Sequence, residues 1–173
     1  MCIRVCLQCS TMSFIPLLSS DLIPFSISRA AANCSGLLQC MIEDEDADIT
    51  EPIPILGVDG TILQKIIEFC EHHVQDPMPE IKKPIPSGEF QTLVNSWYDS
   101  YVDIPHTTLF PLVEAANYMD IKPLMDLACA KIAHMIKDKS VEQIRETFHL
   151  PNDFTPEEEA AFREELRWCE EEA

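Results

Sequence analysis

Residues 140–172 read SVEQIRETFHLPNDFTPEEEAAFREELRWCEEE, and two helix starts are encoded in this stretch. Ser140 with Gln143 forms a capping box, in which the hydroxyl and the amide each satisfy a backbone N–H at the helix start. Thr155 with Glu158 forms a second box of the same kind. The stretch therefore predicts two short helices joined by a turn.

The two ends of the second helix differ in their charge. Pro156 takes the first helical position, where its missing N–H costs nothing, and Glu157–Glu159 lie at the positive end of the helix dipole. At the other end Glu170–Glu172 crowd the negative end of the dipole, which is unfavourable. We expect this helix to begin firmly and to fray at its end.

Both helices carry a thin apolar stripe, made of Val141, Ile144 and Phe148 in the first and of Phe162, Leu166 and Cys169 in the second, with Trp168 beside it. Helices of this length are marginal in isolation and need packing to persist. A stripe of this width can pack on the chain's own core or on a partner. The residues alone leave both interpretations open.

Length, composition and net charge limit the number of domains and the kinds of partner that this chain can have. The chain has 173 residues, 46% of them apolar, which is enough for one domain with a core. Its net charge of −18 argues against binding to nucleic acid or to anionic membranes, because their phosphates would be repelled. Basic partners or simple solubility are the natural interpretations of such a charge.

The cysteines do not form a disulfide framework. Cys70 and Cys129 fall on apolar helical faces, where a free thiol behaves as a small hydrophobe. Cys6 and Cys9 form a lone pair, whereas a structural zinc site needs a second pair. We expect a reduced, cytosolic chain. No signal peptide is indicated, and no apolar run is long enough to span a membrane.

The first third of the chain predicts a small sheet. Residues 15–18 and 22–27 read as strands around a Ser-Ser-Asp turn, and Pro16 and Pro24 favour edge or end positions for them. Two short helical turns follow within residues 30–41, and then an acidic loop at 43–51. Residues 53–56 read as a third strand.

Helices dominate the remainder. Asp59 opens a helix with a broad apolar face, formed by Ile62, Leu63, Ile66, Ile67, Phe69, Cys70 and Val74. A proline-rich loop and a partly helical segment at 90–102 follow. Thr108 begins the next helix, which places Pro111 in its first turn. Pro123 begins another, apolar nearly all round, which either lies in the core or presents a second face to a partner. The fold class is α+β.

No catalytic or metal-binding pattern is present. His72 and His73 are neighbours on a helix and point about 100° apart, so they cannot grip one metal, and we expect them to be solvated. The sequence has no glycine-rich phosphate loop, no Gly-x-Ser-x-Gly elbow and no cysteine with an activating histidine nearby. The residues therefore do not support an enzyme, and they imply no cofactor, metal or small-molecule substrate.

Three blocks of sequence resemble the Skp-type adaptor subunit of SCF (cullin–F-box) ubiquitin ligases. They are the strand and helix at 53–70, the segment 108–121 with its Ala-Ala-Asn-Tyr-Met-Asp-Ile run, and the long C-terminal stretch from Ile144 to Glu170. The resemblance extends from about Ser19 to the end. Asp21-Leu22 departs from it, since the family has an Asp-Gly hairpin there, and the turn loses its residue with positive φ.

The resemblance implies a BTB/POZ-like domain at 12–138, followed by a two-helix extension at 139–173. Residues 1–11 show no clear period, and we expect them to be a disordered extension or an upstream misassigned start. The resemblance also implies a non-catalytic adaptor in ubiquitin-dependent degradation, in the cytoplasm and nucleus, with F-box proteins and a cullin as partners. Asn117 and Tyr118 would face the cullin. The F-box would contact Met125, Cys129, Ile132, Met135, Ile136, Ile144, Phe148, Leu150, Phe154, Phe162, Trp168 and Cys169.

Two other functions remain open at this point. A BTB-like structural subunit of the elongin C type would lack the long C-terminal extension. A divergent paralogue could bind F-box proteins outside any ligase, for instance in a kinetochore or trafficking complex. An enzyme is a more distant alternative.

Overall fold

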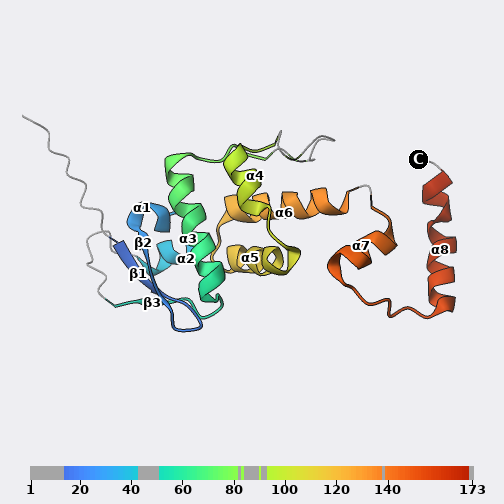
Figure 1. Ribbon diagram of the computed structural model, residues 1–173, viewed down its shortest axis with the longest axis horizontal. Helices are drawn as coiled ribbons and strands as arrows, with labels where there is room; N and C mark the ends of the chain where they lie inside the picture. The colour runs from blue at the N-terminus through green and yellow to red at the C-terminus, as the bar shows by residue number, and fades with distance from the viewer. Residues whose placement is uncertain are drawn as a thin grey trace, which may run out of the picture. The chain divides into compact units, whose positions relative to one another are not determined.

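A computed structural model describes residues 14–42, 51–81, 83, 90, 93–137 and 139–171, with side chains described through residue 165. The chain divides into two compact units, Met1–Met135 and Ile136–Ala173, which are treated separately below (Figure 1). The expected extension at 1–11, the Cys6/Cys9 pair and all of the acidic loop except Glu51 lie outside the described residues.

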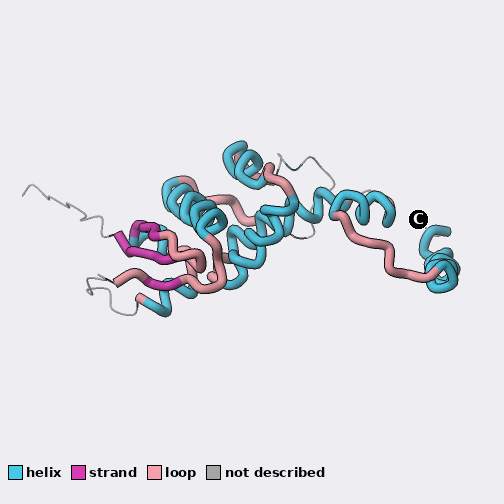
Figure 2. The backbone as a smooth tube through the Cα atoms, turned by 60° about the horizontal axis from the view of Figure 1, so that its bottom comes forward, coloured by secondary structure: helices cyan, strands magenta, loops and turns pink. Residues whose placement is uncertain are grey.

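The first unit begins with a three-stranded sheet of order β2-β1-β3, in which the strands lie side by side (Figure 2). β1 (Phe14–Leu18) pairs antiparallel with β2 (Pro24–Ser28) and parallel with β3 (Ile53–Pro54). Pro24 takes an end position, as expected. The expectation for Pro16 was wrong, because β1 is the central strand. Proline is tolerated there since β3 pairs only with Leu17 and Leu18, so the sheet has two strands at Pro16.

The β1–β2 turn keeps its positive-φ residue despite the missing glycine. Leu22 has φ 63°. Its N–H donates to the carbonyl of Ser19, and the N–H of Ser19 donates to the carbonyl of Ile23. These bonds form a three-residue hairpin loop that ends in a left-handed residue. The expectation that this conformation would be lost was wrong, because the closing hydrogen bonds hold the backbone there.

Two short helices follow the sheet, as the sequence predicts. α1 (Arg29–Ala32) is capped by the hydroxyl of Ser28, and α2 (Gly36–Met41) by the hydroxyl of Ser35. Ser28 also donates its N–H and hydroxyl to the Glu71 carboxylate. These two bonds tie the start of α1 to the long helix α3 (Gly60–Gln75).

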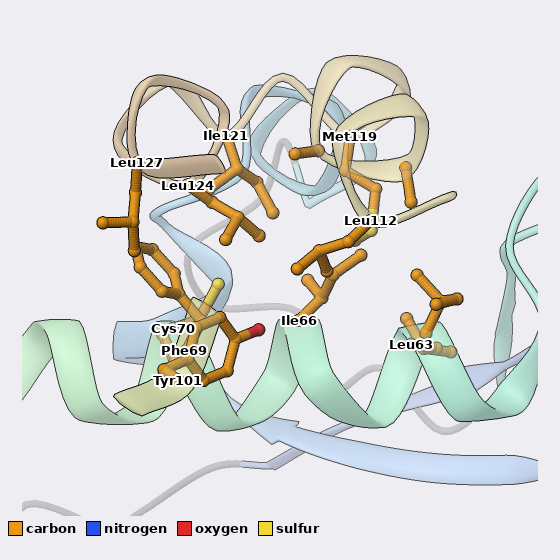
Figure 3. Close-up of a cluster of buried hydrophobic side chains, with 14 of the residues drawn as sticks. Leu63, Ile66, Phe69, Cys70, Tyr101, Leu112, Met119, Ile121, Leu124 and Leu127 are labelled. Atoms are coloured by element: carbon orange, nitrogen blue, oxygen red, sulfur yellow. The ribbon is translucent and has the colours of Figure 1, made fainter. Parts of the chain in front are cut away.

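α3 supplies the centre of the core. It begins at an Asp59 cap, as expected, and its Leu63, Ile66, Phe69 and Cys70 are buried. These side chains meet residues from α4 (Ser96–Val102), α5 (His106–Tyr118), α6 (Lys122–Ile136) and the connection between α5 and α6, namely Tyr101, Leu112, Met119, Ile121, Leu124 and Leu127 (Figure 3). Val74, expected on this face, is exposed at the helix end.

His72 and His73 are half-buried and stacked on aromatic rings, so the expectation of a fully solvated pair was wrong. His72 stacks on Trp97 with 3.6 Å between ring centroids, and His73 stacks on Phe69. The Nδ1 atom of His73 accepts the Met78 N–H at 3.2 Å. Tyr98 of α4 lies edge-on to both rings, and this long-range contact is not encoded in the local spacing.

α5 begins at His106, two residues before the position expected from the sequence, and follows a Pro105 cap. Pro111 therefore lies in the second turn rather than the first. Because proline has no backbone N–H, Pro111 cannot donate the helical hydrogen bond to the Thr107 carbonyl. Thr107 is exposed, so water can satisfy this carbonyl, and the helix continues through Pro111.

The second unit contains the two predicted helices, α7 (Val141–Phe148) and α8 (Pro156–Glu171). Both hydrogen bonds of the Ser140–Gln143 capping box are present: the Gln143 N–H donates to the Ser140 hydroxyl, and the Ser140 N–H donates to the Gln143 side chain. Thr155 and Glu158 also bond reciprocally, and the hydrogen bonds from Thr155 lower the pKa of the Glu158 carboxyl below its usual value. Both helix starts thus confirm the sequence prediction, and the fold class is α+β.

Replacing Leu22 with glycine is expected to stabilise the protein. A left-handed conformation costs an L-residue about 1–2 kcal/mol, and glycine removes this cost. Glycine also loses more backbone entropy on folding, so the expected net stabilisation is about 0.5–1 kcal/mol. Leu22 is 74% exposed, so little packing is lost. Chemical denaturation measures the difference. Leu22→Ala is the matched control and should give no gain, because it keeps the Cβ. A Leu22→Gly protein less stable than Leu22→Ala would contradict this account.

Acidification should destabilise the first unit through His73. Burial, with a smaller contribution from the charge of His72, lowers the pKa of His73 below 6.5. Below about pH 6.5 the unfolded state therefore binds more protons than the folded state, and the free energy of unfolding falls as pH drops through the lowered pKa. His73→Gln keeps a hydrogen-bond acceptor but does not titrate. Denaturation at several pH values should show a shallower dependence for this variant, and identical slopes would contradict the assignment.

Candidate protein-interaction surfaces

The outer face of α6 is apolar and lies opposite the face that builds the core. Leu124, Leu127, Ala128 and Ala130 are buried, whereas Cys129 and Ile136 are exposed and Ile132 and Met135 are half-buried. Met125 packs partly against the core. Positions 125, 129, 132 and 136 share one side of a helix. Cys129 is thus on this outer stripe and not in the core.

Phe154, in the segment that connects α7 and α8, contacts a side chain of each helix and borders a groove. The Phe154 and Phe162 rings form an edge-to-face pair with 5.3 Å between centroids. The Arg145 guanidinium lies over the Phe154 ring at 5.5 Å. The groove of about 520 Å³ is lined by Lys139, Ser140, Val141, Glu142, Arg145, Phe154, Glu159, Phe162 and Arg163. Its wall is therefore mixed, with apolar rings between charged side chains.

No side chain between residues 139 and 165 is buried. Val141, Leu150, Phe154 and Phe162 are each at least 44% exposed, and Ile144 and Phe148 are half-buried. Trp168 and Cys169 lie in the helical part of α8, but their side chains are outside the described set. The second unit thus presents most of its large apolar side chains to solvent, instead of enclosing them in a core.

A separate surface lies at the C-terminal end of α5. Asn117 is exposed and Tyr118 is 45% exposed. The Tyr118 ring lies close over Gly57, where a Cβ would be 3.4 Å from it. The two predicted residues are therefore together at the surface of the first unit.

Hydrogen bonds from α2 fix this helix end. The buried Ser35 hydroxyl donates to the Met119 carbonyl at 2.6 Å. The N–H groups of Leu37 and Gly36 donate to the carbonyls of Met119 and Asp120. The two carbonyls that follow α5 thus satisfy donors at the start of α2, which holds the end of α5 and Tyr118 in place.

Exposed apolar residues that the sequence analysis did not select lie in the segments beside Tyr118. Leu56 is 76% exposed and precedes Gly57. Leu22 and Ile23 are exposed in the β1–β2 turn, which bonds to the same segment through the Ser20 N–H and the Val58 carbonyl. Local periodicity could not select them, since they are in turns.

The described residues contain no group of three or more His, Cys, Asp or Glu side chains that could hold a metal. None of the described helices has the length and apolar character needed to cross a membrane. The candidate sites are the surfaces defined above: the α6 stripe, the α7–α8 groove and the end of α5.

Comparison with known families gives two matches. Residues 13–75 match the tetramerisation domain of the Skp1 family, which is of POZ type and confirms the BTB/POZ-like fold expected from the sequence. Residues 122–169 match the dimerisation domain of the same family, a range that includes α6, α7 and most of α8.

Curated proteins from several organisms align along nearly the whole chain. An S-phase kinase-associated protein 1 homolog of Tetrahymena thermophila is 46% identical, over 91% of this chain and 94% of its own. The E3 ubiquitin ligase complex SCF subunit sconC of Arthroderma benhamiae is 44% identical, over 91% and 95%. Suppressor of kinetochore protein 1 of Schizosaccharomyces pombe is 41% identical, over 92% and 99%. The chain therefore belongs to the Skp1 family.

Proposed function

We propose that this chain is a non-catalytic adaptor that joins an F-box substrate receptor to the cullin scaffold of an SCF ubiquitin ligase. One observation carries the proposal: residues 139–165 form two well-capped helices without a single buried side chain. Helices of this kind need a partner to cover their apolar face. A relative named as an SCF ubiquitin ligase subunit supports the assignment.

The F-box would cover the α6 stripe and the apolar side chains of α7 and α8. The partner would contact the twelve side chains that the family resemblance selects, among them Met125, Ile132, Phe154 and Phe162. Arg145 and Arg163 border the groove, so acidic groups at the rim of the F-box would be accommodated there. The cullin would bind the other surface, at Asn117 and Tyr118.

The mechanism requires proximity and no chemistry from this chain. The adaptor would hold the receptor, with its substrate, near a ubiquitin-conjugating enzyme that the scaffold recruits. Such an arrangement accelerates transfer by raising the effective concentration of the reacting groups. We further propose a cytoplasmic and nuclear location, as the resemblance implies, which imaging of the tagged chain would test.

A role with F-box proteins outside a ligase is the second candidate. It is favoured by the relative named a suppressor of kinetochore protein. The cullin surface separates the two candidates, because only the ligase role requires it. An elongin C-type subunit is disfavoured, since the family match at 122–169 includes the C-terminal extension.

Removing the Phe162 ring should weaken binding to an F-box protein without destabilising the free chain. Phe162 is 48% exposed, so its removal leaves no cavity in a core. A buried interface aromatic contributes about 2 kcal/mol, or roughly 30-fold in Kd. Titration calorimetry would compare Phe162→Ala with Phe14→Ala, an exposed phenylalanine of the first unit that should bind normally. Trp168→Ala should behave like Phe162→Ala. A lowered Tm with unchanged Kd would show that α8 packs within the free chain instead.

A double substitution, Asn117→Ala with Tyr118→Lys, should weaken cullin binding while F-box binding persists. The lysine removes an aromatic anchor and places a charge where we expect a desolvated contact. Co-precipitation with each purified partner measures the two interactions separately. Glu114→Ala, an exposed site on the same helix, should leave both intact. Loss of both partners together would mean that the pair is structural and that this surface is not the cullin site.

A further inference from the structure

Leu22 combines an unfavourable backbone conformation with an exposed side chain. Its φ of 63° lies in the left-handed region, which is costly for any residue that carries a Cβ. The side chain is 74% exposed, so packing within the chain offsets little of this cost. Backbone strain of this kind clusters at functional sites. Strain and exposure together are typical of a side chain that contacts a partner.

The turn that carries Leu22 is bonded to the residues just before and at the start of α3. The Ser20 N–H donates to the Val58 carbonyl at 2.9 Å. The Gly60 N–H donates to Asp21 Oδ1 at 2.8 Å. Both bonds join segments that are far apart in the sequence. The position of Leu22 is therefore fixed relative to the segment that connects β3 with α3.

Ile23 extends the apolar surface from the turn to α3. A Cβ at Gly60 would lie 2.9 Å from Ile23 Cδ1, so the isoleucine side chain lies against the first residue of the helix, and it remains partly exposed. The same connecting segment carries the exposed Leu56 and, next to it, Gly57, which faces the Tyr118 ring. One short segment thus joins the β1–β2 turn to the end of α5.

These contacts define an apolar strip, which consists of Leu22, Ile23, Leu56 and Tyr118. Neighbouring exposed apolar side chains on a soluble protein mark interaction sites. The one charged side chain of the turn, Asp21, already accepts hydrogen bonds from the Ser19 hydroxyl and the Gly60 N–H. The strip is therefore suited to an apolar partner surface and not to a charged one.

We propose that Leu22 and Ile23 extend the cullin-binding surface and contact an apolar face of the scaffold beside Tyr118. This assignment rests on the proposed adaptor function, and the cullin is the occupant because the strip is continuous with the surface at Asn117 and Tyr118. The family that the sequence resembles has glycine at the position of Leu22. The leucine contact would therefore be particular to this chain.

Titration calorimetry with a purified cullin and the full-length chain tests the assignment. Leu22→Gly should raise the Kd about tenfold, because part of a buried leucine contact is lost. The same substitution relieves backbone strain, so the Tm should stay the same or rise, and unfolding cannot explain weaker binding. Leu22→Met keeps an apolar side chain, and its Kd should lie closer to that of the unsubstituted chain.

Two controls make the result specific. Val74→Ala changes an exposed apolar residue at the other end of α3 and should leave the Kd for the cullin unchanged. Binding to an F-box protein should be the same for Leu22→Gly as for the unsubstituted chain, because the turn is far in sequence and structure from α7 and α8 and belongs to the other compact unit.

The outcomes separate this assignment from the adaptor function. An unchanged Kd for the cullin in Leu22→Gly overturns the assignment and leaves the adaptor function intact, whereas an unsubstituted chain that does not bind the cullin overturns both. Equal weakening of F-box and cullin binding would also overturn the assignment. So would sedimentation data in which the free chain self-associates, Leu22→Gly abolishes the self-association and cullin binding persists, because the occupant would then be a second copy of the chain.

Discussion

The buried face of α3 is the interaction on which the first unit depends. Leu63, Ile66, Phe69 and Cys70 meet residues of α4, α5 and α6, and Glu71 on the same helix holds the start of α1. Each such apolar side chain contributes about 1.5–3 kcal/mol when fully buried. The candidate scaffold surface depends on this core indirectly, because Tyr118 is positioned by an α5 helix that is packed on α3 and whose end is bonded to α2.

The second unit is built on a different principle. Its helix starts are defined by two reciprocal capping boxes, each worth on the order of 1 kcal/mol, but none of its described side chains through residue 165 is buried. Caps determine where a helix begins, whereas burial determines whether it persists. An apolar surface that is arranged but not covered is suited to a partner, which would supply the missing burial on binding. The low burial of the extension is therefore consistent with its proposed role in binding a partner.

Local signals predicted much of this fold. The caps at Ser140, Thr155 and Asp59 and the α+β order could be inferred from the sequence, because each depends on residues only a few positions apart. Two of the errors occurred where distant contacts decide: His72 and His73 pack against aromatic rings of α4, and β1 is central because β3 joins it late in the chain. The third error is local, since Leu22 is held at positive φ by hydrogen bonds within the hairpin. The predicted partner residues on α6, α7 and α5 are at least partly accessible.

The central claim is that α7 and α8 acquire their burial from a partner. Hydrogen–deuterium exchange of residues 139–165, measured in the free chain and in a complex with a purified F-box protein, tests it most directly. The account predicts fast exchange in the free chain relative to α3, and strong protection in the complex, because local opening is easy where few apolar groups are buried. Protection of α7 and α8 equal to that of α3 in the free chain, unchanged on binding, would contradict the claim.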